Sequence, residues 1–262
     1  MTVQQALSTS GVDPREARVL LAAASGFSEA SLIGFPERQI PGDVQQRFAE
    51  FVARRKKSEP VAYILGRKEF YGLELAVNPA VLIPRPETEL LVDLALEREF
   101  SSAVDLGTGC GAIALALKKH RPRARVVAVE ASAAALYVAQ RNAVKQNLDI
   151  EFRHGLWFGP LAGERVDLIV SNPPYVAAGD PHLADLRYEP DVALVAGADG
   201  LDAIREIARS APRHLAPGGC LLVEHGRGQD GAVRGLLAAA GLEGVATWPD
   251  LAGIPRVSGG KR

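Results

Sequence analysis

The stretch DLGTGCG, residues 105–111, lies between an apolar run and the helical pattern AIALALKK. Glycines at such a junction permit a tight turn and let a ligand approach the backbone closely. Gly107, Gly109 and Gly111 give the spacing G-x-G-x-G, whereas dinucleotide pyrophosphates are associated with G-x-G-x-x-G. The stretch therefore predicts a strand, a ligand-binding loop and a helix, without a pyrophosphate cradle.

Strand and helix patterns alternate on both sides of this loop. Strands are expected at 104–106, 125–129, 150–154, 166–170 and 220–224, and the clearest helical stripe runs through 204–215. Alternation of this kind is typical of an α/β fold with a parallel, doubly wound, Rossmann-like sheet.

An acidic residue follows the second expected strand. Glu130 stands 19 positions after Gly111, where a carboxylate can accept hydrogen bonds from both hydroxyls of a ribose. S-adenosyl-L-methionine fits these features, because its ribose needs the acid and its amino-acid part needs polar backbone near the glycines. A purely structural turn with an incidental glutamate is the disfavoured alternative, and Cys110 is interpreted as a small residue, not a nucleophile.

The sequence SNPPY, residues 171–175, ends the fourth expected strand, at the edge where open α/β sheets bind ligands. Asn172 offers an acceptor and a donor, while Pro173 has no N–H to donate. A substrate NH2 group could give one proton to the Asn172 side chain and one to the Pro173 carbonyl, with Tyr175 over its planar face. This corner favours methyl transfer to a planar nitrogen, either a glutamine amide or an adenine amine.

The chain before the sheet is expected to form a small helical bundle followed by a hairpin. Asp13 and Pro14 predict a helix start with Gly26 as its stop, and Asp43 is expected to cap a second helix. The period then changes to an alternation around 69–77 that predicts a β-hairpin. We therefore predict a helical domain at 1–66, a β-hairpin linker at 67–85 and a third region at 86–262.

The composition excludes several classes of protein. Thirty basic and 31 acidic residues give a net charge of −1, which does not favour binding to nucleic-acid phosphates. The two cysteines have no metal-ligand spacing, so no metal is expected. No apolar run approaches the roughly 18 residues of a membrane span, and the expected location is the cytoplasm. The basic run 54–57 is interpreted as a solvated helix end, with a contact to RNA or a partner as the disfavoured alternative.

Together with these motifs, the segments EPVAYILGRKEFYG (59–72), LIPRPETE (82–89) and LAPGGCLLVEHG (215–226) make the chain resemble the HemK/PrmC methyltransferases. That family methylates the N5 side-chain amide nitrogen of glutamine in the Gly-Gly-Gln motif of peptide-chain release factors, which modulates translation termination. The resemblance implies a class I methyltransferase domain at 86–262, S-adenosyl-L-homocysteine as the product, a helical domain that helps dock the release factor, and no membrane or nucleic-acid substrate.

Carried over residue by residue, the resemblance implies two sets of contacts. The expected cofactor contacts are Gly107, Thr108, Gly109, Cys110, Gly111, Glu130, Trp157 and Asn172, and the expected substrate contacts are Asn172, Pro173, Pro174 and Tyr175. Of these, Asn172, Pro173 and Tyr175 are expected to be catalytic. Two departures concern the cofactor: family members usually carry Asp at position 130, and Leu156 offers no carboxylate to the adenine amino group.

Two rival functions and several residues complete the sequence interpretation. The closest rival is an adenine-N6 methyltransferase of DNA or RNA, and the other is a non-catalytic docking module that keeps the fold. The segment 177–200 is interpreted as a lid, with His182, Arg187 and Glu189 as surface residues. His225 is expected to make a structural hydrogen bond.

Overall fold

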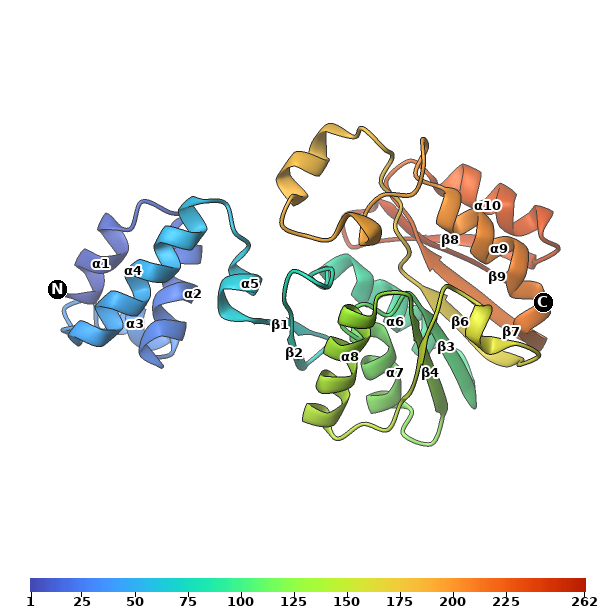
Figure 1. Cartoon of the computed structure of the whole chain (residues 1–262), viewed down its shortest axis with the longest axis horizontal. Coiled ribbons are helices and arrows are strands. Elements are labelled where there is room, and N and C mark those ends of the chain that lie inside the picture. The colour runs from blue at the N-terminus through green and yellow to red at the C-terminus, as the bar shows by residue number, and fades with distance from the viewer. The chain divides into compact units, whose positions relative to one another are not determined.

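The computed structural model describes all 262 residues, which divide into two compact units, Met1–Arg67 and Lys68–Arg262 (Figure 1). The first unit contains five helices: α1 (Val3–Thr9), α2 (Pro14–Ser25), α3 (Glu29–Gly34), α4 (Gly42–Lys56) and α5 (Val61–Leu65). Their apolar faces share one buried cluster, which includes Leu20, Leu21, Leu32 and Phe48. None of the helices in the chain is long and apolar enough to cross a membrane.

Helix α2 begins and ends where the sequence predicts. The Asp13 carboxylate accepts hydrogen bonds from the backbone N–H groups of Arg15 (2.9 Å) and Glu16 (3.2 Å), which lack partners inside the helix. Gly26 ends the helix with a left-handed φ of 74°, which glycine adopts without strain.

The predicted cap of helix α4 is wrong. The helix begins at Gly42 with Pro41 as its N-cap, and Asp43 lies inside the first turn without a capping hydrogen bond. Pro41 has the extended backbone of an N-cap (φ −56°, ψ 152°), and the helical backbone begins at the next residue, before Asp43. At the other end, Arg54 pairs with Glu59 (2.5 Å).

The second unit opens with the predicted hairpin, β1 (Arg67–Phe70) and β2 (Leu73–Ala76). Tyr71 and Gly72 form its turn with φ values of 51° and 69°, as a two-residue turn with two positive φ angles requires. The Asp93 carboxylate accepts a hydrogen bond from the Tyr71 hydroxyl at 2.6 Å, which ties the turn to helix α6 (Glu89–Leu96).

A seven-stranded sheet with the order β5-β4-β3-β6-β7-β9-β8 forms the centre of this unit. Its strands are β3 (Ser102–Leu106), β4 (Arg125–Glu130), β5 (Glu151–His154), β6 (Val166–Ser171), β7 (Leu215–Glu224), β8 (Glu243–Pro249) and β9 (Pro255–Lys261). The first five pair in parallel, as predicted, but β9 is antiparallel to both of its neighbours, so the sheet is mixed. Only a short turn joins β8 to β9, and such a connection makes the two strands antiparallel.

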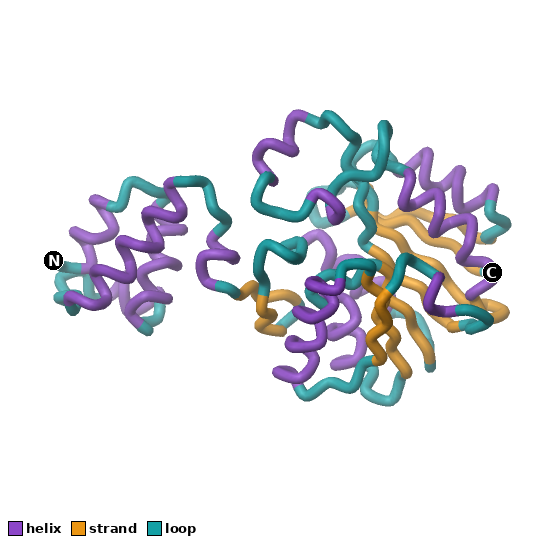
Figure 2. Tube along the Cα trace, in the orientation of Figure 1, coloured by secondary structure: helices purple, strands orange, loops and turns teal.

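Helices cover both faces of the sheet (Figures 1 and 2). Helices α6, α7 (Ala112–His120) and α8 (Ala133–Gln146) pack on one face of the sheet. Helices α9 (Asp202–His214) and α10 (Asp230–Ala239) pack together on the other face. The predicted stripe of α9 is buried through Ile204, Ile207 and Ala211. This packing fixes the carboxyl ends of β3, β4 and β6 at one edge, where parallel sheets of this class bind ligands.

Candidate functional site

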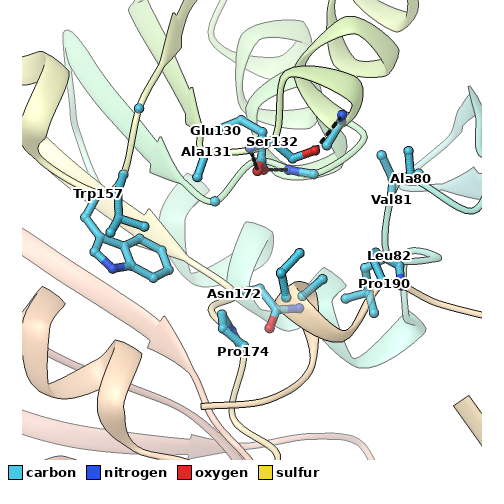
Figure 3. Close-up of a pocket in the computed structure, with 17 residues that line it drawn as sticks. Ala80, Val81, Leu82, Glu130, Ala131, Ser132, Trp157, Asn172, Pro174 and Pro190 are labelled. Carbon is cyan, nitrogen blue, oxygen red and sulfur yellow. Dashed lines mark hydrogen bonds between the residues drawn. The ribbon is translucent and has the colours of Figure 1, made fainter. Parts of the chain in front are cut away.

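A cavity of about 370 Å³ lies at this edge of the sheet. Figure 3 shows Glu130 on one side of it, Trp157 on another, and Asn172 and Pro174 opposite Glu130. The other lining residues, none of which the sequence analysis names individually, are Ala80, Val81, Leu82, Ala131, Ser132, Ala135, Gly155, Pro190, Val192 and Ala193. Leu82 begins the LIPRPETE segment, and the last three belong to the segment 177–200 that was interpreted as a lid.

Two glycines of the loop 107–111 line the cavity. Gly109 has a left-handed φ of 58°, and a Cβ atom there would meet no other atom within 4 Å. No side chain therefore separates the Gly109 backbone from the cavity, and a ligand can approach the main chain closely. Gly107 has a φ of 74°, and a Cβ there would lie 3.3 Å from the Trp157 ring.

The other three residues of the loop lie behind it and do not line the cavity. Thr108 is buried and donates a hydrogen bond from its hydroxyl to Oδ2 of Asp105 at 2.6 Å. Cys110 is buried as well, and burial raises the pKa of its thiol to about 12, which leaves it a poor nucleophile. A Cβ at Gly111 would lie 3.0 Å from Leu115, so this glycine allows close packing of the loop on its helix.

The Asp105 side chain stabilises the loop 107–111 through hydrogen bonds on the side away from the cavity. Its carboxylate is fully buried and also accepts a hydrogen bond from the backbone N–H of Ala114 at 3.2 Å, while its Oδ1 atom has no partner. Burial raises its pKa to about 7, the hydrogen bonds from Thr108 and Ala114 lower it, and the charge of Glu130 raises it further.

Glu130 faces the cavity from the end of β4. Its Oε2 accepts a hydrogen bond from the backbone N–H of Gly109 and its Oε1 from that of Ser132, both at 2.9 Å (Figure 3). A carboxylate has about four lone-pair sites, so each oxygen keeps capacity for a further hydrogen bond. These two bonds hold the carboxylate close to the glycine loop.

Trp157 and Leu156 form an apolar wall of the cavity. The Trp157 ring packs against the central hydrophobic cluster, the buried cluster that includes Val104, Ile169 and Ile207, and also lines the cavity. Its backbone has a φ of 45°, which is uncommon for a bulky residue. Leu156 is 61% exposed and contributes no polar atom to the wall.

Asn172 has the most distinctive polar environment in the site. Its Nδ2 donates a hydrogen bond to the Thr88 hydroxyl at 3.0 Å, but its Oδ1 is buried and has no partner. Buried acceptors are normally paired, and one left open beside a cavity suits a donor on a bound ligand. Pro174 lines the cavity next to it, whereas Pro173 is buried behind.

Tyr175 does not line the cavity. Its hydroxyl donates a hydrogen bond to Oε1 of Glu224 at 3.2 Å, and its ring packs against the central cluster. Burial, together with the charge and the hydrogen bond of Glu224, raises the pKa of the phenol. Its backbone carbonyl accepts a hydrogen bond from Gln229 at 3.0 Å, so Tyr175 is held at both ends.

The segment 177–200 carries two short 3-10 turns, Pro181–Leu186 and Asp191–Ala193, and contributes Pro190, Val192 and Ala193 to the cavity. The interpretation of Glu189 as a surface residue is wrong. Glu189 is 6% exposed, pairs with Arg85 and accepts a hydrogen bond from the backbone N–H of Ile83 at 2.9 Å. A buried carboxylate needs such partners, and they come from the LIPRPETE segment, far away in sequence.

Two other polar residues near the site have structural contacts. The structural hydrogen bond expected for His225 is confirmed, because its Nε2 lies 2.9 Å from the Ser258 hydroxyl. Asn142 of α8, which the sequence interpretation missed, bonds both the N–H (2.7 Å) and the carbonyl (3.0 Å) of Ala76 and the carbonyl of Cys110 (2.8 Å). Asn142 thus joins the hairpin to the glycine loop.

Comparison with known proteins identifies the family. Residues 2–66 match the PrmC N-terminal domain, and residues 86–185 match the methyltransferase small domain. A release factor glutamine methyltransferase of Neisseria gonorrhoeae is 48% identical over 267 aligned positions, covering 100% of this chain and 98% of the relative. The chain belongs to the release factor glutamine methyltransferase family.

Other relatives agree with this assignment. The release factor glutamine methyltransferase of Pseudomonas aeruginosa is 49% identical, with 94% of this chain and 91% of the relative aligned. The fold matches the crystal structure of a methyltransferase from Pyrococcus furiosus with a TM-score of 0.58 at 19% identity, covering 80% of this chain and 96% of that one. The class I methyltransferase fold expected from the sequence is confirmed, and the family assignment implies that S-adenosylmethionine is used.

Proposed function

We propose that this chain transfers a methyl group from S-adenosylmethionine to N5 of the glutamine in the Gly-Gly-Gln motif of peptide-chain release factors. The observation that carries the proposal is the buried, unpartnered Oδ1 of Asn172 beside the cavity that Gly109 and Glu130 line. Relatives that align over nearly the whole chain and are named release factor glutamine methyltransferases support the choice of substrate.

The cavity residues fit S-adenosylmethionine. Gly109 offers bare backbone, Glu130 offers free lone pairs to the ribose hydroxyls, and Trp157 with Leu156 offers an apolar wall to the adenine. Glutamate in place of the family's usual aspartate keeps the charge, and its extra methylene spans the distance to the Gly109 N–H. Thr108, Cys110 and Gly111 would support this contact by shaping the loop.

When bound, S-adenosylmethionine supplies an electrophilic methyl group on a sulfonium ion. In this proposal Oδ1 of Asn172 accepts a hydrogen bond from one N–H of the substrate amide, which favours a localised lone pair on the nitrogen. The second acceptor would be the backbone carbonyl of Pro173, which is joined to the lining residue Pro174, although Pro173 itself does not line the cavity. Holding the nitrogen about 3–3.5 Å from the methyl carbon contributes much of the rate. S-adenosylmethionine would supply the methyl group and leave as S-adenosylhomocysteine, its sulfur keeping the electron pair of the C–S bond, while the amide nitrogen would give up one proton to water.

The remaining parts of the site have supporting roles in this proposal. Pro174 would contact the substrate side chain, and Tyr175, anchored by Glu224 and Gln229, would keep the corner in shape. We assign release-factor docking to the helical domain at 1–66 and catalysis to the domain at 86–262, joined by the hairpin linker at 67–85. We expect the reaction in the cytoplasm, where release factors work on ribosomes.

The test is to incubate the protein with methyl-labelled S-adenosylmethionine and either a purified release factor or duplex DNA. The expected result is one label per release factor, located by peptide mass on the glutamine of its Gly-Gly-Gln motif. A release factor with that glutamine replaced by asparagine is the matched control. Label on DNA adenine would favour the adenine-N6 rival, and label on neither substrate would contradict the proposal.

A further inference from the structure

Two segments that are distant in sequence form one wall of the cavity. The LIPRPETE segment contributes Leu82, and the segment 177–200 contributes Pro190 and its neighbours. Figure 3 shows Leu82 and Pro190 on the side of the cavity opposite Trp157. The shape of this wall therefore depends on what joins the two segments.

The carboxylate of Glu189 joins them, with one contact from each of its oxygens. Oε2 accepts a hydrogen bond from the backbone N–H of Ile83 at 2.9 Å, and Oε1 pairs with the guanidinium of Arg85. Ile83 directly follows the lining residue Leu82. Glu189 directly precedes the lining residue Pro190. The two contacts therefore fix the spacing of the segments at the cavity wall.

A carboxylate is a costly group with which to join two segments. The Glu189 side chain is 3% exposed, and burial of a charge is unfavourable unless hydrogen bonds and an opposite charge compensate it. Apolar side chains would join the segments at lower desolvation cost, but apolar contacts have no preferred direction. The contacts of Glu189 are directional, so they select one arrangement of the two segments.

We propose that Glu189 is a positioning residue that holds the segment 177–200 against the LIPRPETE segment and so keeps the cofactor cavity preformed. This inference rests on the proposed function, which places S-adenosylmethionine in this cavity. Glu189 does not line the cavity, so it acts through its neighbours in the chain. Without Glu189 the wall is in place in only a fraction of the molecules, and the apparent dissociation constant rises in inverse proportion to that fraction.

The expected effect is on cofactor binding more than on methyl transfer, because other contacts hold the substrate end of the site. The Thr88 hydroxyl accepts a hydrogen bond from Nδ2 of Asn172 at 3.0 Å, without Glu189. Beyond the lining residues, the N–H of Ala196 donates a hydrogen bond to the carbonyl of Val176 at 3.0 Å. Loss of Glu189 should therefore release the middle of the segment and leave its end and Asn172 in place.

The first test measures the binding of S-adenosylmethionine to Glu189→Ala by calorimetry. We expect the dissociation constant to rise about tenfold or more, as it does when the wall is in place in about a tenth of the molecules. At saturating cofactor, kcat for release-factor methylation should stay within about threefold of wild type. Asp185→Ala removes an exposed carboxylate from the same segment and is the matched control, with the wild-type dissociation constant expected. An unchanged constant for Glu189→Ala, or an equal rise for Asp185→Ala, would overturn the proposal.

The second test uses Arg85→Met, and it remains informative if Glu189→Ala folds poorly. Arg85 is 33% exposed, and methionine keeps much of its apolar stem. Hydrogen exchange is measured by mass spectrometry on peptides covering 79–83 and 187–193, with and without S-adenosylmethionine. We expect faster exchange than in wild type in both peptides, restored by saturating cofactor, and unchanged exchange in β3 and β4. Wild-type exchange in both peptides of the variant would overturn the proposal.

The measurements also separate this inference from the proposed function. Cofactor binding and hydrogen exchange are measured without a release factor, so a wild-type protein that binds S-adenosylmethionine but methylates no release factor would contradict the proposed function alone. A wild-type protein that binds no S-adenosylmethionine would overturn both.

Discussion

Replacing Asn172 with alanine tests the proposed grip on the substrate nitrogen most directly. The change removes the one buried, unpartnered acceptor at the substrate end of the cavity and leaves Gly109 and Glu130 in place. Because positive charge develops on the nitrogen during attack, this hydrogen bond is charge-assisted in the transition state. Such bonds contribute about 1.5–3 kcal/mol, so kcat should fall about 10- to 150-fold.

The assay separates chemistry from cofactor binding. Single-turnover methylation of a release factor gives the chemical rate, and quenching of Trp157 fluorescence reports binding of S-adenosylmethionine at the cavity wall. Cofactor affinity should change by less than about fivefold, because Asn172 is one contact among several. Gln140→Ala is a suitable control, since it removes an exposed amide from α8 outside the cavity. Asn172→Asp keeps an acceptor of the same shape and should retain more activity than Asn172→Ala.

The result that would refute this reasoning is a single-turnover rate for Asn172→Ala within about twofold of wild type, with the protein folded. A variant that loses cofactor affinity in proportion to its rate would also contradict it. In that case Asn172 would act on the cofactor and not on the substrate nitrogen.

Three further predictions concern the glycine loop and its supports. Gly109→Ala should weaken S-adenosylmethionine binding at least about tenfold and lower the melting temperature through the strain of alanine at a positive φ. Gly111→Ala has the same kind of strain, and its Cβ would also press on Leu115, so it should lower the melting temperature further. Equal melting temperatures for the two variants would contradict this contrast. The free energy of unfolding of Asp105→Asn should rise relative to that of wild type as pH rises from about 4 to 7. The folded-state pKa of Asp105 is raised to about 7, so wild type loses stability over this window, by at most about 1.4 kcal/mol per pH unit, as denaturant titrations can check. Asn142→Ala removes three hydrogen bonds and should cost about 3 kcal/mol in urea unfolding; a loss below about 1 kcal/mol would contradict the joining role.

The elements with strong local signals were predictable from sequence. Helix α2 has a capping aspartate, a proline and a terminal glycine, and these local contacts determine its ends. The hairpin turn at Tyr71 depends on two adjacent residues. The parallel part of the sheet follows from alternation of buried strands with helices. The antiparallel strand β9 was missed because its pairing depends on which strand edge is free, which no short window of sequence encodes.

The candidate site was predictable only where its residues belong to motifs. Gly109, Glu130 and Asn172 could be named, and the structure brings all three to one cavity. The position of Tyr175 could not be foreseen, because a tyrosine after two prolines can turn toward the ligand or toward the core. Its direction is set by Glu224, which lies 49 positions away in sequence. For the same reason the pairing of Glu189 with Arg85, 104 positions apart, could not be predicted.

The distribution of unpartnered polar atoms connects the fold to the proposed chemistry. Buried side-chain atoms without a partner are Oδ1 of Asp105, Oδ1 of Asn172, Oε2 of Glu224 and Nε of Arg98, and the first three belong to residues at the carboxyl ends of β3, β6 and β7. Each such atom costs about 1–3 kcal/mol of stability, which a protein tolerates more readily where a ligand or a mechanism uses it. Of these three residues only Asn172 lines the cavity, and its open atom is an acceptor. A substrate NH2 group, which becomes a stronger donor as it is methylated, matches that arrangement, and acceptors fixed before the reaction need no reorganisation during it.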